Sequence, residues 1–125
     1  MKTAIALLML VVLSSQAYAY NLDLQVNNQT KIHNVLKSIN QSYFENVNTI
    51  TFVNSNPIYR RYIEGGHVLE TIGLYAPNTI IIYDWKTYEE LNLREALIHE
   101  LKHHYCWQKE FYLGHEGCFL HTPIR

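Results

Sequence analysis

Five residues near the C-terminal end of the chain, His99-Glu100-Leu101-Lys102-His103, form the pattern H-E-x-x-H. On an α-helix, side chains four positions apart lie on the same face, so His99 and His103 could bind one metal ion together. Glu100 is turned by about 100° from His99, which places its carboxylate beside the metal, where it can accept a proton from a bound water. The pattern therefore predicts a zinc (Zn2+) site with Glu100 as its general base.

The residues around this pattern predict a helix with a defined start. The segment 92–95 reads as a capping box, with Asn92 as the N-cap and Glu95 three positions later. From Leu93 to roughly Glu110 the chain contains neither Pro nor Gly. The helix face expected to pack inward, beside the metal-binding face, carries Ala96, Leu97, Leu101 and His104.

A zinc ion that keeps one position open for water needs a third protein ligand. The segment 114–121 is rich enough in histidine, glutamate and cysteine to supply it. His115 is the first choice as the ligand, and Glu116, His121 and Cys118 remain alternatives.

The two cysteines, Cys106 and Cys118, flank the same region. Cys106 follows His99 by two helical turns, so it would lie on the metal-binding face of the helix. An even pair of cysteines in a small protein of an oxidising compartment predicts a disulfide bond. One cysteine acting as a zinc ligand and two free thiols are the alternatives.

The first 19 residues have the composition of a secretory signal peptide. Lys2 supplies a positive start, residues 4–13 are a short apolar run, and Ala17-Tyr18-Ala19 is an A-x-A cleavage site. The apolar run is too short to span a bilayer comfortably. We therefore expect a mature protein that begins at Tyr20, lacks a membrane span, and works in the periplasm or outside the cell.

Composition limits the remaining functions. The chain has 10 Lys and Arg against 11 Asp and Glu, and neither a basic run nor a basic helix face occurs. Nothing in this charge pattern predicts binding to nucleic acid or to anionic lipid. Residues 20–125 are long enough for one small domain, which we expect to be monomeric.

Hydrophobic spacing predicts the other elements. Apolar residues recur at helical spacing from Asn28 to Phe44, and β-branched residues predict a strand from Asn48 to Val53. A hairpin follows, with strands over His67–Tyr75 and Thr79–Tyr83 joined by a turn at residues 76–78. The fold class expected is α+β, in which a small antiparallel or mixed sheet is backed by one helix and carries the H-E-x-x-H helix.

Three further expectations concern short segments and two histidines. The unbroken run Ile80-Ile81-Ile82 is typical of a strand that is covered on both faces. The segment 58–63 is ambiguous between helix and strand. His33 and His67 are expected at the surface, and for His67 an approach to the site from the hairpin is the alternative.

The order of a strand hairpin, a helix with His-Glu-Leu-Lys-His and a Gly-His loop resembles the SprT-like zinc metallopeptidase domain, a minimal zincin. Members of that family place a third zinc-binding histidine in a Gly-His-Gly-x-x-Phe-like loop after the helix. Gly114-His115 matches it here, with Phe119 four residues beyond His115. The resemblance covers roughly Gly65–His121, and it implies that His115 is a ligand.

The chain also departs from that family. Typical members of that family are intracellular, and some of them act at DNA. This chain instead carries a signal-peptide pattern and has no basic surface. The Gly that follows the loop histidine in the family is Glu116 here. A DNA-linked function is therefore not expected.

These observations predict a zinc-dependent hydrolase of peptide bonds, acting on a peptide or protein substrate. The substrate would extend along the exposed strand of the hairpin, around Val68–Leu74, and Tyr105, Tyr112 or His121 could stabilise the oxyanion. Two alternatives stay open: a non-catalytic, zinc-stabilised binding module and a zinc amidase or peptidase directed at peptidoglycan.

Overall fold

The computed structural model describes residues 18–24, 30–55, 61–64, 67–70 and 72–125. The predicted signal peptide therefore lies outside the described residues, apart from its last two. The predicted surface position of the His67 side chain is also outside what the structure describes.

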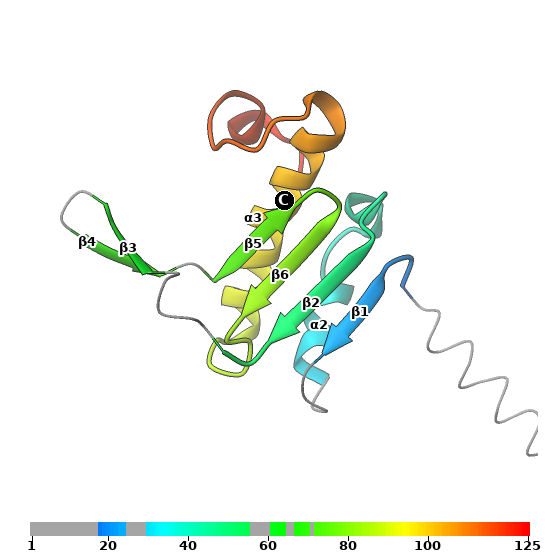
Figure 1. Ribbon diagram of the computed structural model, residues 1–125. Coiled ribbons are helices and arrows are strands. Elements are labelled where there is room, and N and C mark those ends of the chain that lie inside the picture. The colour runs from blue at the N-terminus through cyan, green and yellow to red at the C-terminus, as the bar shows by residue number, and fades with distance from the viewer. Residues whose placement is uncertain (1–17, 25–29, 56–60, 65–66, 71) are drawn as a thin grey trace, which may run out of the picture.

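A four-stranded mixed sheet forms the centre of the protein (Figure 1). Its order is β1 (Asn21–Leu24), β2 (Thr49–Val53), β6 (Thr79–Tyr83) and β5 (Gly73–Ala76). β1 and β2 run parallel to each other, as do β2 and β6, whereas β5 is antiparallel to β6. β5 therefore lies at one edge of this sheet.

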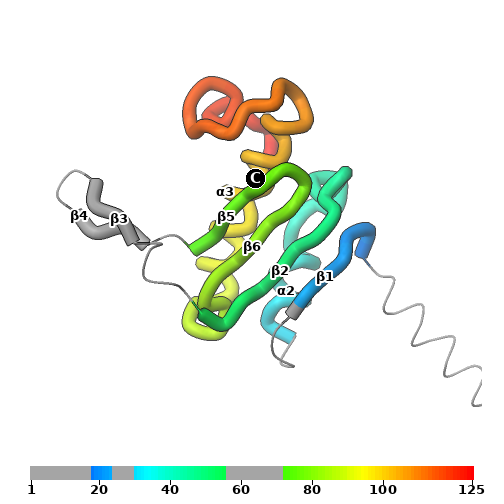
Figure 2. The backbone as a smooth tube through the Cα atoms, viewed as in Figure 1, coloured from blue at the N-terminus to red at the C-terminus, as the bar shows by residue number. Residues whose placement is uncertain are grey.

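Two helices lie on the same side of the sheet, α2 (Thr30–Lys37) and α3 (Glu90–Glu110) (Figure 1). Two short 3-10 helices, η1 (Gln41–Phe44) and η3 (Gly117–His121), complete the described helical elements. After α3 the chain turns back, and the C terminus lies beside that helix (Figure 2). The α+β class with a small mixed sheet and two helices is confirmed.

The hydrophobic core lies between the sheet and the helices, because each strand directs every second side chain towards α2 and α3. The largest aliphatic and aromatic contributors are almost completely buried: Trp85, Phe52, Ile32, Leu36, Ile50, Ile80, Ile82, Leu93, Leu97 and Leu101. Ile81 between them is only partly buried. The prediction of a strand covered on both faces is therefore wrong for the described part of the chain, where both helices pack on one face.

The predicted hairpin exists, but its first strand is shorter than expected. A two-residue turn at Pro77-Asn78 pairs β5 with β6, with Pro at the first central position and Asn78 at the second in the left-handed conformation (φ 62°), as in a type II turn. Residues 67–70, which were expected in the same strand, do not pair with β6. They form β4 (His67–Glu70), which pairs instead with β3 (Arg61–Glu64) in a separate two-stranded sheet. Residues 61–63 of the ambiguous segment thus belong to a strand, and residues 58–60 lie outside the described residues.

Both predicted helices have different ends in the structure. α2 ends at Lys37, and a separate 3-10 helix follows, whose N-cap Asn40 accepts a hydrogen bond from the Ser42 backbone N–H. α3 begins at Glu90, so the predicted capping box is wrong. Its N-cap is Glu89, which makes no side-chain capping bond, and the predicted cap residues lie inside the helix.

A buried histidine ties α3 to two other parts of the fold. The ring of His104 is 2 % exposed, and its Nε2 lies 2.6 Å from the Glu45 carbonyl oxygen. Because Nε2 must donate to that carbonyl, Nδ1 accepts from the Tyr75 hydroxyl at 2.7 Å. The same hydroxyl accepts the Asn78 backbone N–H at 2.8 Å. Burial lowers the pKa of His104, which keeps the ring neutral.

Replacing Tyr75 by Phe tests this network. The variant leaves the Nδ1 atom of His104 and the N–H of Asn78 without the hydroxyl, so we expect a loss of about 1–3 kcal/mol of unfolding free energy. Tyr43→Phe is the matched control, since its hydroxyl makes an exposed 3.3 Å bond to the Pro123 carbonyl. Urea unfolding of the two variants measures the difference, and equal stabilities would contradict the role assigned to Tyr75.

Candidate metal centre

The structure brings three histidines together in the middle of a cleft. His99 and His103 project from one face of α3, as their spacing predicts, and His115 approaches from the loop after the helix. The Nε2 atom of His115 lies 3.1 Å from Nε2 of His103 and 3.2 Å from Nε2 of His99. Ligand atoms of all three lie within 4.8 Å of one another, close enough to bind one metal ion.

Hydrogen bonding among the rings alone does not account for this arrangement. A neutral imidazole has one N–H donor and one acceptor nitrogen, and here one nitrogen of each ring points at the same place. His115 Nε2 could pair well with one neighbour but not with both. A tetrahedral zinc ion with bonds of about 2.0–2.1 Å would separate its nitrogen ligands by about 3.4 Å, close to what the structure shows.

Electrostatics also keeps these rings in the metal-binding form. Burial, and then the neighbouring His99 and His115, lowers the pKa of His103 to about 4. Burial, followed by His115 and Lys102, lowers the pKa of His99. Neutral imidazole is the form that ligates metals, so these two ligands need not lose a proton near neutral pH.

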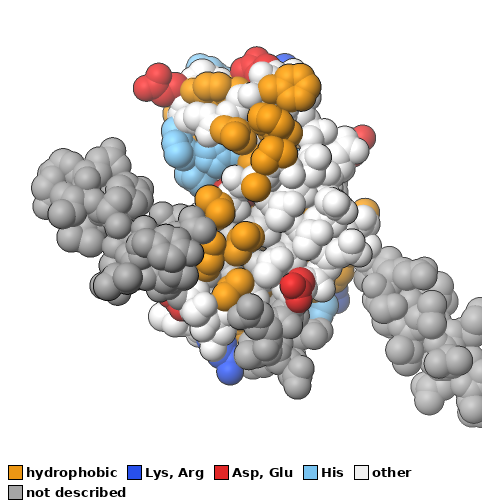
Figure 3. Space-filling view, viewed as in Figure 1, with side chains coloured by type: hydrophobic (Ala, Val, Ile, Leu, Met, Phe, Trp, Pro, Cys, Tyr) orange, Lys and Arg blue, Asp and Glu red, His pale blue; other side chains and the backbone are white. Residues whose placement is uncertain are grey.

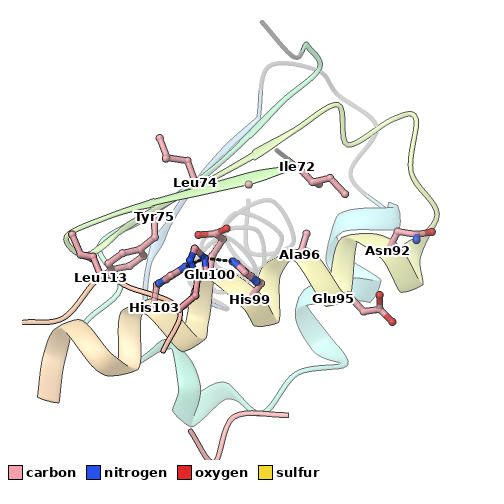
Figure 4. A pocket seen from close by; sticks show the side chains of 12 residues that line it. Ile72, Leu74, Tyr75, Asn92, Glu95, Ala96, His99, Glu100, His103 and Leu113 are labelled. Carbon is pink, nitrogen blue, oxygen red and sulfur yellow. Dashed lines mark hydrogen bonds between the residues drawn. The ribbon is translucent and has the colours of Figure 1, made fainter. Parts of the chain in front are cut away.

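Glu100 lies beside the three histidines and is 5 % exposed. Its carboxylate is directed between α3 and β5 (Figure 4). A Cβ atom built on Gly73 would lie 3.0 Å from Glu100 Oε1, so the strand can approach this closely only because residue 73 has no side chain. Burial raises the pKa of Glu100 to about 8.

The aromatic ring of Phe119 contacts all three histidines. Its centroid is 4.9 Å from that of His99, 4.7 Å from that of His103 and 5.1 Å from that of His115. Phe119 therefore forms a wall that limits the orientations of the rings. Its role was visible in sequence only through the resemblance of the Gly-His loop.

The loop that carries His115 and Phe119 is tied to α3 by a disulfide bond between Cys106 and Cys118. The predicted pairing is confirmed, with a Cα–Cα distance of 5.9 Å, and neither cysteine is free to act as a ligand. Cys106 is fully buried on α3, so the bond fixes η3 against the helix. The position of the third histidine thus depends on this covalent link.

The other candidate ligands and oxyanion donors lie elsewhere. Glu116 and His121 are exposed and do not belong to the three-histidine group. The Tyr112 hydroxyl accepts the Glu116 backbone N–H at 3.3 Å and would collide with a Cβ on Gly114. Neither Tyr112 nor Tyr105 nor His121 is among the residues that line the cleft.

His33, expected as a surface residue, is only partly exposed. Its Nδ1 lies 2.6 Å from the Tyr18 hydroxyl, and the two rings stack. It lies outside the three-histidine group, as expected.

The cleft in front of the histidines has a volume of about 570 Å³ and lies between β5 and α3 (Figure 4). In the space-filling view, histidine side chains reach the surface below the C-terminal segment, next to a band of hydrophobic side chains (Figure 3). A ligand of peptide size could therefore reach both the imidazoles and Glu100.

No protein-family model, no curated protein and no solved structure matches this chain. In the described part of the chain, no helix is both long and apolar enough to cross a membrane. The function must therefore be argued from the geometry of the site.

The disulfide bond leads to a prediction about metal binding. Replacing both Cys106 and Cys118 by Ser removes the tie on the loop, while His99 and His103 stay on the helix. We expect the affinity for zinc to fall by about 10- to 100-fold, the usual cost of losing a group that orients a ligand. Competition with a chromogenic chelator measures the affinity, and reducing the native protein should give the same loss. An unchanged affinity in both cases would show that the loop needs no covalent tie.

Proposed function

We propose that the protein is an exported, zinc-dependent peptidase of the SprT-like type, which hydrolyses peptide bonds with Glu100 as the general base. The observation that carries the proposal is the convergence of three imidazole nitrogens beside a buried carboxylate, in a cleft bounded by an edge strand. Export is supported by the signal-peptide pattern of residues 1–19 and by the disulfide bond.

The donor set fits zinc. His99, His103 and His115 would hold the ion through Nε2, and three neutral nitrogen ligands with an open fourth position are the arrangement of catalytic zinc sites. When bound, zinc supplies Lewis-acid polarisation of a carbonyl oxygen and lowers the pKa of water from about 15.7 towards about 7.

Glu100 then carries a proton from the attacking water to the leaving group. Its carboxylate accepts one proton from the attacking water, whose oxygen forms the new bond to the carbonyl carbon. The same proton passes to the departing amine as the C–N bond breaks, so the products are a carboxylic acid and an amine, which then ionise to a carboxylate and an ammonium group. The position of Glu100 beside the three imidazoles supports this role, because a cation held there would favour the carboxylate, which is the form that accepts a proton.

β5 supports a peptide as the ligand of the cleft. The Tyr83 backbone N–H donates to the Ile72 carbonyl at 2.7 Å, which sets the alternation of the ladder. By that alternation the main-chain groups of Gly73 and Tyr75 point away from β6, towards the open edge. An extended peptide could pair with them by strand addition. The proposed docking strand is therefore β5, which shares Gly73 and Leu74 with the segment Val68–Leu74 favoured by the sequence.

Zinc content and hydrolysis, measured on matched variants, test the proposal. His115→Ala should lower zinc affinity by about 100-fold or more, since loss of a mere supporting partner already costs about 10- to 100-fold. Glu100→Gln should retain zinc and lower kcat by about 100- to 10,000-fold. His121→Ala and Glu116→Gln, exposed neighbours outside the cluster, should behave like the wild type in both measurements.

The same experiment separates the alternatives. A protein that binds zinc but cleaves neither peptides nor isolated cell-wall material would be a binding module. Release of stem peptides from purified sacculi, without cleavage of protein substrates, would identify a peptidoglycan-directed enzyme. Full activity in Glu100→Gln would rule out the general base assigned here.

The close approach of Gly73 gives a second test. A methyl group there would lie 3.0 Å from Glu100 Oε1 and 3.1 Å from Ile82 Cδ1, so Gly73→Ala must displace the carboxylate. We expect kcat to fall about tenfold or more with zinc content unchanged, because small misplacements of catalytic groups are costly. Ala76→Ser, exposed on the same strand, is the control. An unaffected kcat in Gly73→Ala would show that the contact does not position Glu100.

A further inference from the structure

The two ends of the cleft differ in chemistry, with the three-histidine cluster between them (Figure 4). At one end lie the Tyr75 ring and the Leu113 side chain, which is 46 % exposed although it is large and apolar. At the other end lie Asn92 and Glu95, both exposed. A bound chain would therefore meet an apolar surface on one side of the cluster and an acidic one on the other.

The helix spacing fixes how far the acidic end is from the metal-binding nitrogens. Glu95 precedes His99 by four residues and Asn92 precedes it by seven, so all three lie on one face of α3. Along the helix axis Glu95 is displaced from His99 by about 6 Å. An extended peptide advances about 3.3 Å per residue, so this distance corresponds to about two residues.

Charge makes the acidic end selective. Among the described residues that line the cleft there is no Lys or Arg, and the two carboxylates are those of Glu95 and Glu100. Glu100 is committed to the chemistry at the cluster. Glu95 is therefore the carboxylate that remains to pair with a cation on the ligand.

The direction of β5 determines which part of a bound peptide lies at which end of the cleft. β5 runs from Gly73, beside Ile72 and the acidic end, towards Tyr75 and the apolar end (Figure 4). A peptide that adds to this edge in the antiparallel sense, the slightly more stable pairing, runs the opposite way. Its N-terminal part then contacts Tyr75 and Leu113, and its C-terminal part passes Glu95.

We infer that the cleft selects peptides with a bulky apolar side chain just before the scissile bond and a Lys or Arg within the first three residues after it. Leu113 and Glu95 are the residues that determine this specificity. The inference rests on the proposed peptidase function, and it names the substrate class of that same site.

Four fluorogenic peptides of equal length test it on the zinc-loaded full-length protein. They carry Phe or Ser before the central bond and Lys or Glu two residues after it, and a fifth peptide has Lys and Phe exchanged in order. Mass spectrometry locates the cut. We expect the highest kcat/KM for the Phe–Lys peptide, with about a tenfold preference for Phe over Ser and about a 2- to 5-fold preference for Lys over Glu.

Matched variants assign the two preferences. Glu95→Lys should invert the preference for Lys over Glu, whereas Glu110→Lys, a charge change at the exposed end of the same helix, should leave it unchanged. Leu113→Ser should remove the preference for Phe, and Leu91→Ser, 65 % exposed and outside the cleft, should not. Zinc content should be the same in all four variants.

A separate measurement distinguishes failure of this inference from failure of the peptidase proposal. Binding of the same five peptides to zinc-loaded Glu100→Gln requires no hydrolysis. If the wild type cleaves nothing but binding still favours the Phe–Lys order and depends on Glu95 and Leu113, the specificity stands and the peptidase proposal fails. Preferences that ignore both residues, or that favour the exchanged order, overturn the inference.

Discussion

The rest of the site depends on one constraint, the convergence of three imidazole nitrogens at Nε2 separations of 3.1 and 3.2 Å. Two of these nitrogens come from one helix and follow from its geometry. The third comes from a loop, and a loop has no periodicity to hold a side chain in place. The Cys106–Cys118 bond and the Phe119 ring supply that restraint from two directions, one covalent and one by packing.

α3 can present these ligands because its other faces are fixed to the fold. Leu97 and Leu101 are fully buried between the helix and the sheet. His104, adjacent to the ligand His103, is held by the Tyr75 hydroxyl on β5 and by the Glu45 carbonyl beyond η1. The helix is therefore attached both to the edge strand and to the segment that follows η1. These contacts hold the helix face that carries His99 and His103 opposite β5, which forms the other wall of the cleft.

Local patterns in the sequence predicted the parts of the site that depend on local geometry. His99 and His103 are one turn apart on a helix, and β6 is a run of β-branched residues, so both could be recognised without knowledge of their partners. The position of β5 could not, because it depends on where β6 ends and on the pairing of β3 with β4. The start of α3 was misplaced for a related reason, since Asn92 has the right type for a cap but lies inside the helix. Gly73 had no signal beyond its occurrence in a strand, because its importance comes from a residue 27 positions away.

The burial of Glu100 would couple the protonation of this carboxyl to the binding of a cation by the three histidines. In the protein alone, desolvation raises the pKa of this carboxyl to about 8, so near neutral pH the neutral acid predominates and could not accept a proton. A divalent cation held by the three neutral imidazoles would act in the opposite direction, because a nearby positive charge favours the carboxylate. The low dielectric of the site strengthens that attraction as well as the desolvation penalty. The close approach of Gly73 matters for both effects, since it excludes water from one side of the carboxylate while leaving the other side open to the cleft.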